Sequence, residues 1–304
     1  MCMRVLITGA GGTLGTALAP ALAEAGHEPV LFDLQPLESQ YESVQGDVRT
    51  ADDVRAAARG AEFIVHTAAI HGIHLRNHTP QDFYDLNLTG TFNVWEAAVE
   101  AGVRGLVFSS TMGVYGESRK PPSDAAVVEL HEELPLLPGD IYGYTKVAGE
   151  EMCRFYGRKH GIPSVALRYG MFVPEPFFRY GIRLLYGGVD TADVVGSVLA
   201  SMTALSADRL QWDAFNVESF VPFTAEDGPQ LRHDPLVVLD KYYPGATALL
   251  RERGVQELAP ITVYYPMARL AERLGFRPQC NFEQWLEELR SRPEEQAEQS
   301  PPWP

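Results

Sequence analysis

The residues best suited to chemistry in this sequence are Tyr142 and Lys146, which form a Y-x-x-x-K pattern. Inside a predicted helix, this spacing puts both side chains on one face, so that the lysine ammonium can act on the phenol. A free tyrosine loses its proton near pH ~10, which is too high for a base at neutral pH. Because a neighbouring positive charge favours the phenolate, we predict that the pKa of Tyr142 is lowered and that Tyr142 acts as a general acid or base.

A hydroxyl-rich stretch, Phe108–Gly116 (FSSTMGVYG), begins where a predicted strand ends. In open α/β sheets, ligands bind at the carboxyl edge of the strands. A hydroxyl group at this edge can hydrogen-bond an alcohol oxygen of the substrate and polarise the carbon that loses hydride. The two stretches together predict redox chemistry at a secondary alcohol.

Gly9, Gly12 and Gly15 form a G-x-x-G-x-x-G turn between a predicted strand, RVLIT, and a predicted helix. Such glycines let the backbone approach a pyrophosphate, and the helix N-terminus attracts this anion. Asp33 ends the second predicted strand, where its carboxylate can accept hydrogen bonds from both ribose hydroxyls and repels a 2′-phosphate, which favours NAD over NADP. Asp47 either meets the adenine amino group or caps the helix that begins at Ala51, and the sequence leaves both roles open.

The elements that must position these residues alternate along the first two-thirds of the chain. Short apolar runs predict buried strands at Arg4–Thr8, Pro29–Asp33, Glu62–His66, Gly105–Ser109 and Ser164–Arg168. Amphipathic stretches predict helices at Thr13–Ala25, Ala51–Arg59, Pro80–Ala101 and Asp140–His160. This alternation predicts an α/β fold with a doubly wound parallel (Rossmann) sheet.

The pattern changes after residue 169. We expect a helix at 190–205, a strand at 214–218, a loop at 224–233, and helices at 235–253, 266–274 and 281–290. The sequence thus predicts an NAD-binding domain of residues 1–168 and 190–205, with a smaller, mostly helical substrate lobe of residues 169–189 and 206–291. Residues 292–304 have nothing to bury except Trp303, so we expect a disordered tail.

Composition narrows the class of protein. The chain has 304 residues and a net charge of −15, which argues against a nucleic-acid partner. Neither a membrane-spanning apolar run nor a signal peptide is evident, so we expect no membrane partner and a cytoplasmic location. The cysteines Cys2, Cys153 and Cys280 form no cluster, so we expect neither a disulfide framework nor a structural zinc.

Several motifs together resemble the extended short-chain dehydrogenase/reductase family, which includes nucleotide-sugar epimerases, dehydratases and uronate dehydrogenases. In chain order they are the glycine turn, Asp33, His66-Thr-Ala-Ala69, Asn87, SSTMGVYG and YGYTK. The resemblance implies that Tyr142 is the general acid/base, that Lys146 lowers its pKa, that Thr111 supplies the hydroxyl and that Asn87 shapes the helix lining the site. It also implies NAD as the cofactor and a homodimer formed through helices 80–101 and 140–160. The predicted NAD contacts are Gly9, Gly12, Thr13, Leu14, Gly15, Asp33, Asp47, Val48, Ala68, Ala69, Tyr142 and Lys146.

The substrate region is compact, because Pro174-Glu-Pro176 leads within a few residues to Asp190-Thr-Ala-Asp-Val194. This arrangement resembles that of uronate dehydrogenases and favours NAD-dependent oxidation of a sugar, a uronic acid or a similar polyol. A nucleotide-sugar epimerase or dehydratase that recycles bound NAD is the alternative, since the long segment 223–263 can rebuild a larger pocket. A non-catalytic dinucleotide sensor is disfavoured, because Thr111, Tyr142 and Lys146 are all present.

The substrate contacts that we predict are His71, His74 and Arg168. The two histidines belong to an H-x-x-H-x-x-x-H loop that follows a predicted strand, and no acidic or cysteine ligand accompanies them, so we predict no metal. Arg168 can clamp a carboxylate or phosphate through two hydrogen bonds. Arg179 and Arg183 are further candidates, for which surface or helix pairing is an equal alternative.

Overall fold

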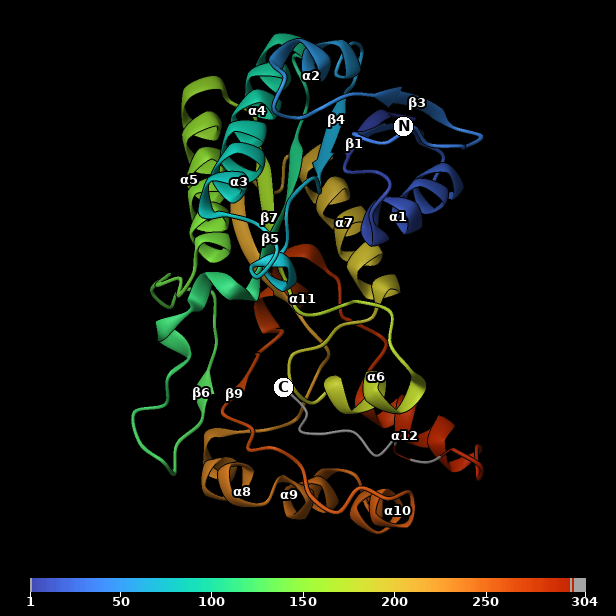
Figure 1. Ribbon diagram of the computed structural model, residues 1–304, viewed down its shortest axis with the longest axis vertical. Coiled ribbons are helices and arrows are strands. Elements are labelled where there is room, and N and C mark those ends of the chain that lie inside the picture. The colour runs from blue at the N-terminus through green and yellow to red at the C-terminus, as the bar shows by residue number, and fades with distance from the viewer. Residues whose placement is uncertain (1, 296, 298–304) are drawn as a thin grey trace.

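The computed structural model describes residues 2–295 and 297, and it confirms the predicted α/β fold. A seven-stranded parallel sheet has the strand order β3-β2-β1-β4-β5-β7-β8 (Figure 1). The strands are β1 (Arg4–Thr8), β2 (Glu28–Asp33), β3 (Glu42–Gln45), β4 (Phe63–His66), β5 (Leu106–Thr111), β7 (Ser164–Tyr169) and β8 (Trp212–Val217). The order reverses between β1 and β4, and open sheets of this kind bind their ligands at such a switch point.

Helices cover both faces of the sheet (Figure 1). One face packs against α1 (Thr13–Glu24), α7 (Thr191–Ser206) and α11 (Ala268–Leu274), and the other against α2 (Ala51–Ala57), α4 (Gly90–Ala101) and α5 (Ile141–His160). Because both faces are covered, the central strands are continuous apolar runs, as Val5, Leu6 and Ile7 of β1 illustrate with 0% exposure.

The long helix predicted over residues 80–101 is interrupted. It consists of α3 (Pro80–Phe83), a π-helical segment at Tyr84–Thr89, and α4. The N-terminus of α3 is fixed by a capping box between Thr79 and Asp82. π-Helical segments often occur at functional sites, and this one carries Asn87.

A smaller lobe with an apolar core of its own follows the sheet strands β7 and β8 along the chain. Its helices are α6 (Phe177–Arg183), α8 (Gly228–His233), α9 (Pro235–Tyr242), α10 (Ala246–Glu252) and α12 (Phe282–Arg290), and the strands β6 (Val128–Glu129) and β9 (Val263–Tyr264) form a short parallel pair. In Figure 1, α8, α9 and α10 lie along the end of the lobe opposite the sheet. Within residues 2–295 and 297, no helix combines the length and the apolar character needed to cross a membrane.

Two predictions in this lobe are wrong. Residues 224–233, predicted as a loop, form a 3₁₀ turn and α8, because Thr224 and Asp227 make a capping box and Pro229 lies in the first turn of α8. The helix predicted over 235–253 is divided into α9 and α10. Pro244 and Gly245 separate the two, and Gly245 has a left-handed φ of 78°.

The predicted tail from residue 292 is described only in part. Arg253 donates a hydrogen bond to the carbonyl of Pro293, and its own carbonyl accepts the N–H of Ala297 at 2.7 Å. Residue 296 and residues 298–304, Trp303 included, lie outside the described residues.

Candidate active site

The three side chains expected to carry the chemistry lie together at the carboxyl end of β5. Thr111 is the last residue of β5, while Tyr142 and Lys146 lie one turn apart near the start of α5. Asp140 fixes this helix end, because its carboxylate accepts the N–H of Gly143 at 2.7 Å. The hydroxyl of Thr111 lies close enough to that of Tyr142 to lower the pKa of Tyr142. A substrate oxygen placed beside this pair would meet both hydroxyls.

Lys146 is held by its own hydrogen bond. Its Nζ donates to the carbonyl oxygen of Ser109 at 2.7 Å, and its side chain is buried. The ammonium also lies 5.0 Å from the ring centroid of Phe108 and 5.9 Å from that of Tyr142. Burial lowers the pKa of Lys146 to about 7.

The pKa of Tyr142 does not show the lowering that we expected. Burial raises it to about 12, the nearby hydroxyl of Thr111 acts in the opposite direction, and the carboxylate of Asp140 raises it further. Lys146 is directed at the carbonyl of Ser109 and loses charge through its own burial. A further positive charge beside the phenol is therefore required for Tyr142 to act as a base at neutral pH.

Asn87 connects the loop after β4 to α5. Its amide accepts the N–H of Ile70 at 2.8 Å and donates to the carbonyl of Ile70 at 3.0 Å. The same amide nitrogen donates to the hydroxyl of Thr145 on α5 at 3.1 Å. Asn87 thus positions the backbone that leads into His71.

The predicted histidine contacts lie beside Tyr142. The ring centroid of His71 is 6.2 Å from that of Tyr142, and His74 follows at 6.3 Å from His71. His71 is exposed to solvent, yet nearby protein atoms and the charge of Lys146 lower its pKa, so its neutral form is favoured. Within the described residues, no group of three or more His, Cys, Asp or Glu side chains is arranged to hold a metal ion.

The glycine turn forms the cradle that a dinucleotide requires. Gly9 has a left-handed φ of 67°, and a Cβ there would lie 2.7 Å from the backbone of Ala68. A Cβ on Gly15 would lie 2.5 Å from the Cα of Ala10, so this glycine allows α1 to pack closely on the turn. No side chain caps the first N–H groups of α1, which begins at Thr13 and Leu14, so they can bind a pyrophosphate.

Asp33 lies next to this turn. Its two carboxylate oxygens accept the N–H groups of Gly11 at 2.9 Å and Gln35 at 3.0 Å, which fixes the carboxylate at the end of β2. Each oxygen keeps a lone pair for a ribose hydroxyl. The geometry therefore fits the adenosine ribose of NAD.

Asp47 has a different partner from either of those that we weighed. Its carboxylate pairs with Arg49 at 2.5 Å, and this pairing lowers the pKa of Asp47. Thr50 occupies the N-cap position of α2 and makes no capping hydrogen bond with its side chain. Val48 is buried, and its carbonyl accepts a hydrogen bond from Asn93 at 2.9 Å.

His66, at the end of β4, supports the segment Thr67–Ala69 that faces the glycine turn. Its Nδ1 lies 2.7 Å from the hydroxyl of Thr8, and its Nε2 lies 2.9 Å from that of Thr91. Because the Thr91 hydroxyl donates to the carbonyl of Asn87, it must accept from His66, so we assign the proton of the ring to Nε2. Burial lowers the pKa of His66 to about 3 and keeps the ring neutral.

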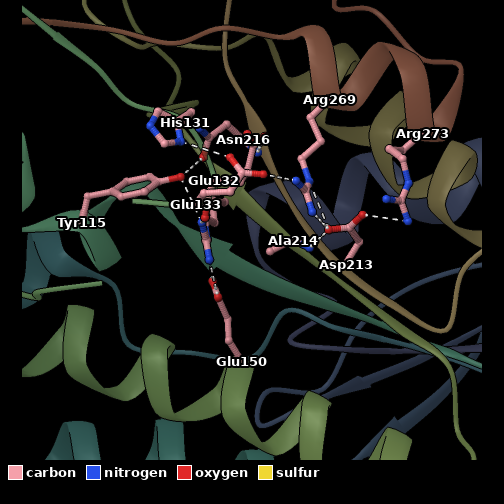
Figure 2. A network of polar contacts seen from close by, with 11 residues as sticks. Tyr115, His131, Glu132, Glu133, Glu150, Asp213, Ala214, Asn216, Arg269 and Arg273 are labelled. Carbon is pink, nitrogen blue, oxygen red and sulfur yellow. Dashed lines mark hydrogen bonds and ion pairs between the residues drawn. The ribbon is translucent and has the colours of Figure 1, made fainter. Parts of the chain in front are cut away.

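Arg168 is not brought to the site. Its guanidinium forms a buried two-pronged ion pair with Glu150 at 2.9 and 2.7 Å, and also donates to the hydroxyl of Tyr115 at 3.0 Å. Figure 2 shows the surrounding network, in which Tyr115 donates to Asn216 and the N–H of Asn216 donates to Glu132. The next residue, Glu133, pairs with Arg269, which in turn pairs with Asp213. Because the donors of Arg168 have partners inside the protein, we do not retain it as a substrate contact. This pairing could not be predicted from the local pattern, since Glu150 lies on another element.

The other two arginines that we considered are also paired. Arg183 is buried and makes an ion pair with Glu175, and its guanidinium donates to the carbonyl of Met171 at 2.8 Å. Arg179 lies 3.4 Å from the same Glu175 and is half-exposed. Together they fix the segment after β7.

A surface hollow of about 290 Å³ lies elsewhere, lined among others by Pro163, Ser206 and Gln211. These residues precede or follow elements at the amino edge of the sheet, opposite Thr111. None of the residues predicted to act in the site lines this hollow. The candidate site is therefore identified by the types and arrangement of its residues, and not by this hollow.

Comparisons with known proteins identify the family. Residues 5–175, more than half of the chain, match the model of the family "NAD dependent epimerase/dehydratase family". The chain is 32% identical over 180 residues to a UDP-glucose 4-epimerase of Streptomyces lividans, covering 56% of this chain and 52% of that one. It is 33% identical over 177 residues to an L-arabinose 1-dehydrogenase (NAD(P)(+)) of Haloferax volcanii, covering 55% and 66%. A uronate dehydrogenase of Pseudomonas syringae is 31% identical over 177 residues, covering 57% and 61%. The matched segment thus spans about half the length of the first of these relatives.

Solved structures extend the likeness to the whole fold. A mutated uronate dehydrogenase superposes with a TM-score of 0.69 at 23% identity, covering 99% of this chain and 90% of that one. A UDP-N-acetylglucosamine 4-epimerase from Bacillus cereus superposes with a TM-score of 0.68 at 21% identity, covering 96% and 99%. At these identities the likeness concerns the fold. The family match, the glycine cradle and the Thr-Tyr-Lys site together place this chain in the NAD-dependent epimerase/dehydratase family of enzymes, whose cofactor is NAD.

Proposed function

We propose that this protein is a dehydrogenase that oxidises a secondary alcohol of a free sugar, a uronic acid or a related polyol, with net reduction of NAD. The observation that carries the proposal is that the hydroxyls of Thr111 and Tyr142 lie beside each other, with the buried Lys146 one helical turn away. Two relatives that are named as dehydrogenases of L-arabinose and of uronates support this substrate class.

The residues divide the work as follows. Thr111 hydrogen-bonds the substrate oxygen, and Tyr142 takes the hydroxyl proton as the carbon–oxygen bond becomes a carbonyl. NAD, when bound, accepts the hydride from the carbon, and its positive ring supplies the charge that favours the phenolate. Lys146 donates to the carbonyl of Ser109, which keeps its Nζ 5.9 Å from the ring centroid of Tyr142. Gly9, Gly12, Gly15 and Asp33 would hold the dinucleotide.

The alternative is a nucleotide-sugar epimerase or dehydratase, which the UDP-glucose 4-epimerase relatives favour. The short segment from Pro174 to Asp190, which contains α6, argues for a smaller substrate. So does the position of α8, α9 and α10, which lie at the far end of the lobe (Figure 1) and pack into its own apolar core.

One assay separates the two. Purified protein is given NAD with free sugars, uronic acids and nucleotide sugars, and NADH is followed by its absorbance. We expect NADH to form in amounts equal to the sugar oxidised. Conversion of a nucleotide sugar to an isomer or a dehydrated product, without net NADH, would replace the dehydrogenase by the alternative.

We also propose that two copies of the chain form a dimer through α4, α5 and the π-helical segment. Large apolar side chains on these elements are exposed: Tyr84 (49%), Phe92 (48%), Tyr144 (53%) and Phe155 (49%). Such side chains on adjacent helices suit burial against a second copy. Phe155→Glu should give a monomer by sedimentation, whereas Val237→Glu, at an equally exposed position of α9, should not. A monomeric wild type at micromolar concentration contradicts this proposal.

A further inference from the structure

Glu218, the first residue after β8, is a buried acid without a polar partner. Its side chain is 0% exposed, and neither carboxyl oxygen has a hydrogen-bond partner among the described residues. Burial raises the pKa of Glu218 well above its ordinary value. Nearly all buried polar groups in folded proteins are satisfied, so an exception at the functional edge of a sheet calls for a function.

The register of the sheet places Glu218 near the catalytic residues. Thr111, Tyr169 and Val217 are partners across β5, β7 and β8. Glu218 follows Val217, and neighbouring strands lie ~4.8 Å apart, so its backbone is roughly 10 Å from that of Thr111. A single sugar ring with its hydroxyl groups can bridge such a span.

Two glycines clear the space around the carboxyl group. A Cβ on Gly170 would lie 1.8 Å from Oε2 of Glu218 and 2.1 Å from the carbonyl oxygen of Gly187. A Cβ on Gly187 would lie 2.6 Å from the ring of Tyr265 and 2.9 Å from the methyl group of Met112. Met112 directly follows Thr111, so Gly187 and Gly170 lie between the end of β5 and the carboxyl group of Glu218.

The remaining polar groups of this cluster are also weakly satisfied. The hydroxyl of Tyr265 donates to the sulfur of Met112 at 3.9 Å, and sulfur is a weak acceptor. Arg119 lies close enough for its charge to act on both Glu218 and Tyr265, and within residues 2–295 and 297 its guanidinium makes no ion pair. The cluster thus contains an acid, a phenol and a cation, each of which can bind a polar group of a ligand.

We propose that Glu218 is a specificity-determining residue that hydrogen-bonds a hydroxyl group of the sugar, distant from the carbon that is oxidised, with Arg119 balancing its charge. The inference rests on the proposed function. A hydroxyl both donates and accepts, so it pairs with Glu218 whether the acid is ionised or neutral, whereas an anionic group pairs only with the neutral acid. Met112, which is unbranched and flexible, turns aside to admit this end of the sugar.

The test uses the full chain, NAD, the best free sugar found in the NADH assay and each monodeoxy analogue of that sugar. The wild type should discriminate against one analogue by about 100-fold in kcat/KM, because loss of that hydroxyl leaves Glu218 unpaired. In Glu218→Met this discrimination should fall to about 3-fold or less, while Glu218→Gln, which keeps a hydrogen-bonding side chain, retains part of it.

A purely structural role for Glu218 predicts a different result. Replacing an unpaired buried acid by an apolar side chain of similar size should leave stability unchanged or raise it, so Glu218→Met is expected to fold. Asp193→Asn is the matched control, because Asp193 is also buried but accepts the N–H groups of Gln279 and Cys280. It should keep the discrimination of the wild type. Equal discrimination in the wild type and Glu218→Met overturns this inference alone, whereas absence of NADH with every sugar overturns the proposed function as well.

Discussion

Nη2 of Arg168 lies 2.7 Å from Oε2 of Glu150, and both side chains are 1% exposed. Glu150 follows Lys146 by one turn on α5, and its other oxygen accepts the hydroxyl of Ser110 at 2.6 Å. The pair therefore joins the catalytic helix to β7 and to the residue before Thr111. We infer that Glu150 and Arg168 position the catalytic residues.

Removing one member of this pair should be costly. In Arg168→Met the carboxylate of Glu150 stays buried without its partner, so we expect a loss of about 3–5 kcal/mol in the free energy of unfolding. The double variant Glu150→Met/Arg168→Met should recover most of this loss, because no charge is left unpaired. Denaturant unfolding of the single and double variants measures both values.

The same double variant distinguishes positioning from substrate binding. If Arg168 acts only inside the protein, the KM for the sugar should change by less than about 3-fold in the folded double variant. A KM that rises by about 100-fold while kcat is kept would mean that Arg168 holds the substrate after all, since that pattern reports lost binding.

His66 should make the protein sensitive to acid. Its pKa is lowered from 6.5 to about 3, so between these pH values His66 binds a proton in the unfolded chain but not in the folded protein. The contribution of this neutral ring to stability is present above pH 6.5 and is lost as the pH falls toward 3. Between about pH 7 and about pH 5 we expect a loss of roughly 2 kcal/mol from this residue.

The comparison for this effect is His66→Gln. Glutamine can keep one hydrogen bond with Thr8 or Thr91 but does not titrate. Urea unfolding at both pH values should therefore give a smaller loss in the variant than in the wild type. Equal losses in the two proteins would mean that carboxyl groups, and not His66, cause the sensitivity.

Asp33 should decide between NAD and NADP. Asp33→Ser removes the charge that repels a 2′-phosphate, so the ratio of kcat/KM for NADP to that for NAD should rise by at least about 10-fold. Asp47→Ser is the matched control, because the Asp47 carboxylate already pairs with Arg49. If Asp47→Ser alters the ratio as much as Asp33→Ser does, the assignment of Asp33 to the ribose is wrong.

The sheet could be predicted well because burial shows in the local sequence: the central strands are apolar runs, and the covering helices have apolar residues at helical spacing. The strand β3 was missed since Glu42–Gln45 is a mostly exposed edge strand without an apolar run. The helix α8 was missed because its sequence is mostly polar, and Leu231 is its one large apolar side chain buried in the core of the lobe. Such elements depend on contacts that the local pattern does not contain.

In the candidate site too, residues with a local sequence signal could be predicted, and residues that depend on contacts between distant elements could not. Thr111, Tyr142 and Lys146 could be found because their spacing on one strand end and one helix is local information. Arg168 was misplaced because its partner, Glu150, comes from another element. Glu218 and Arg119 gave no signal in sequence, since only the folded chain brings the ends of β5 and β8 together.

The central claim is that Tyr142 takes the proton of a substrate alcohol, and replacing it tests this claim most directly. Tyr142→Phe should reduce NADH formation by at least about 1000-fold while NAD binding, measured by fluorescence titration, changes little. Tyr144→Phe, two residues away at an exposed position, should behave as the wild type. Turnover in Tyr142→Phe comparable to that of the wild type would contradict the claim.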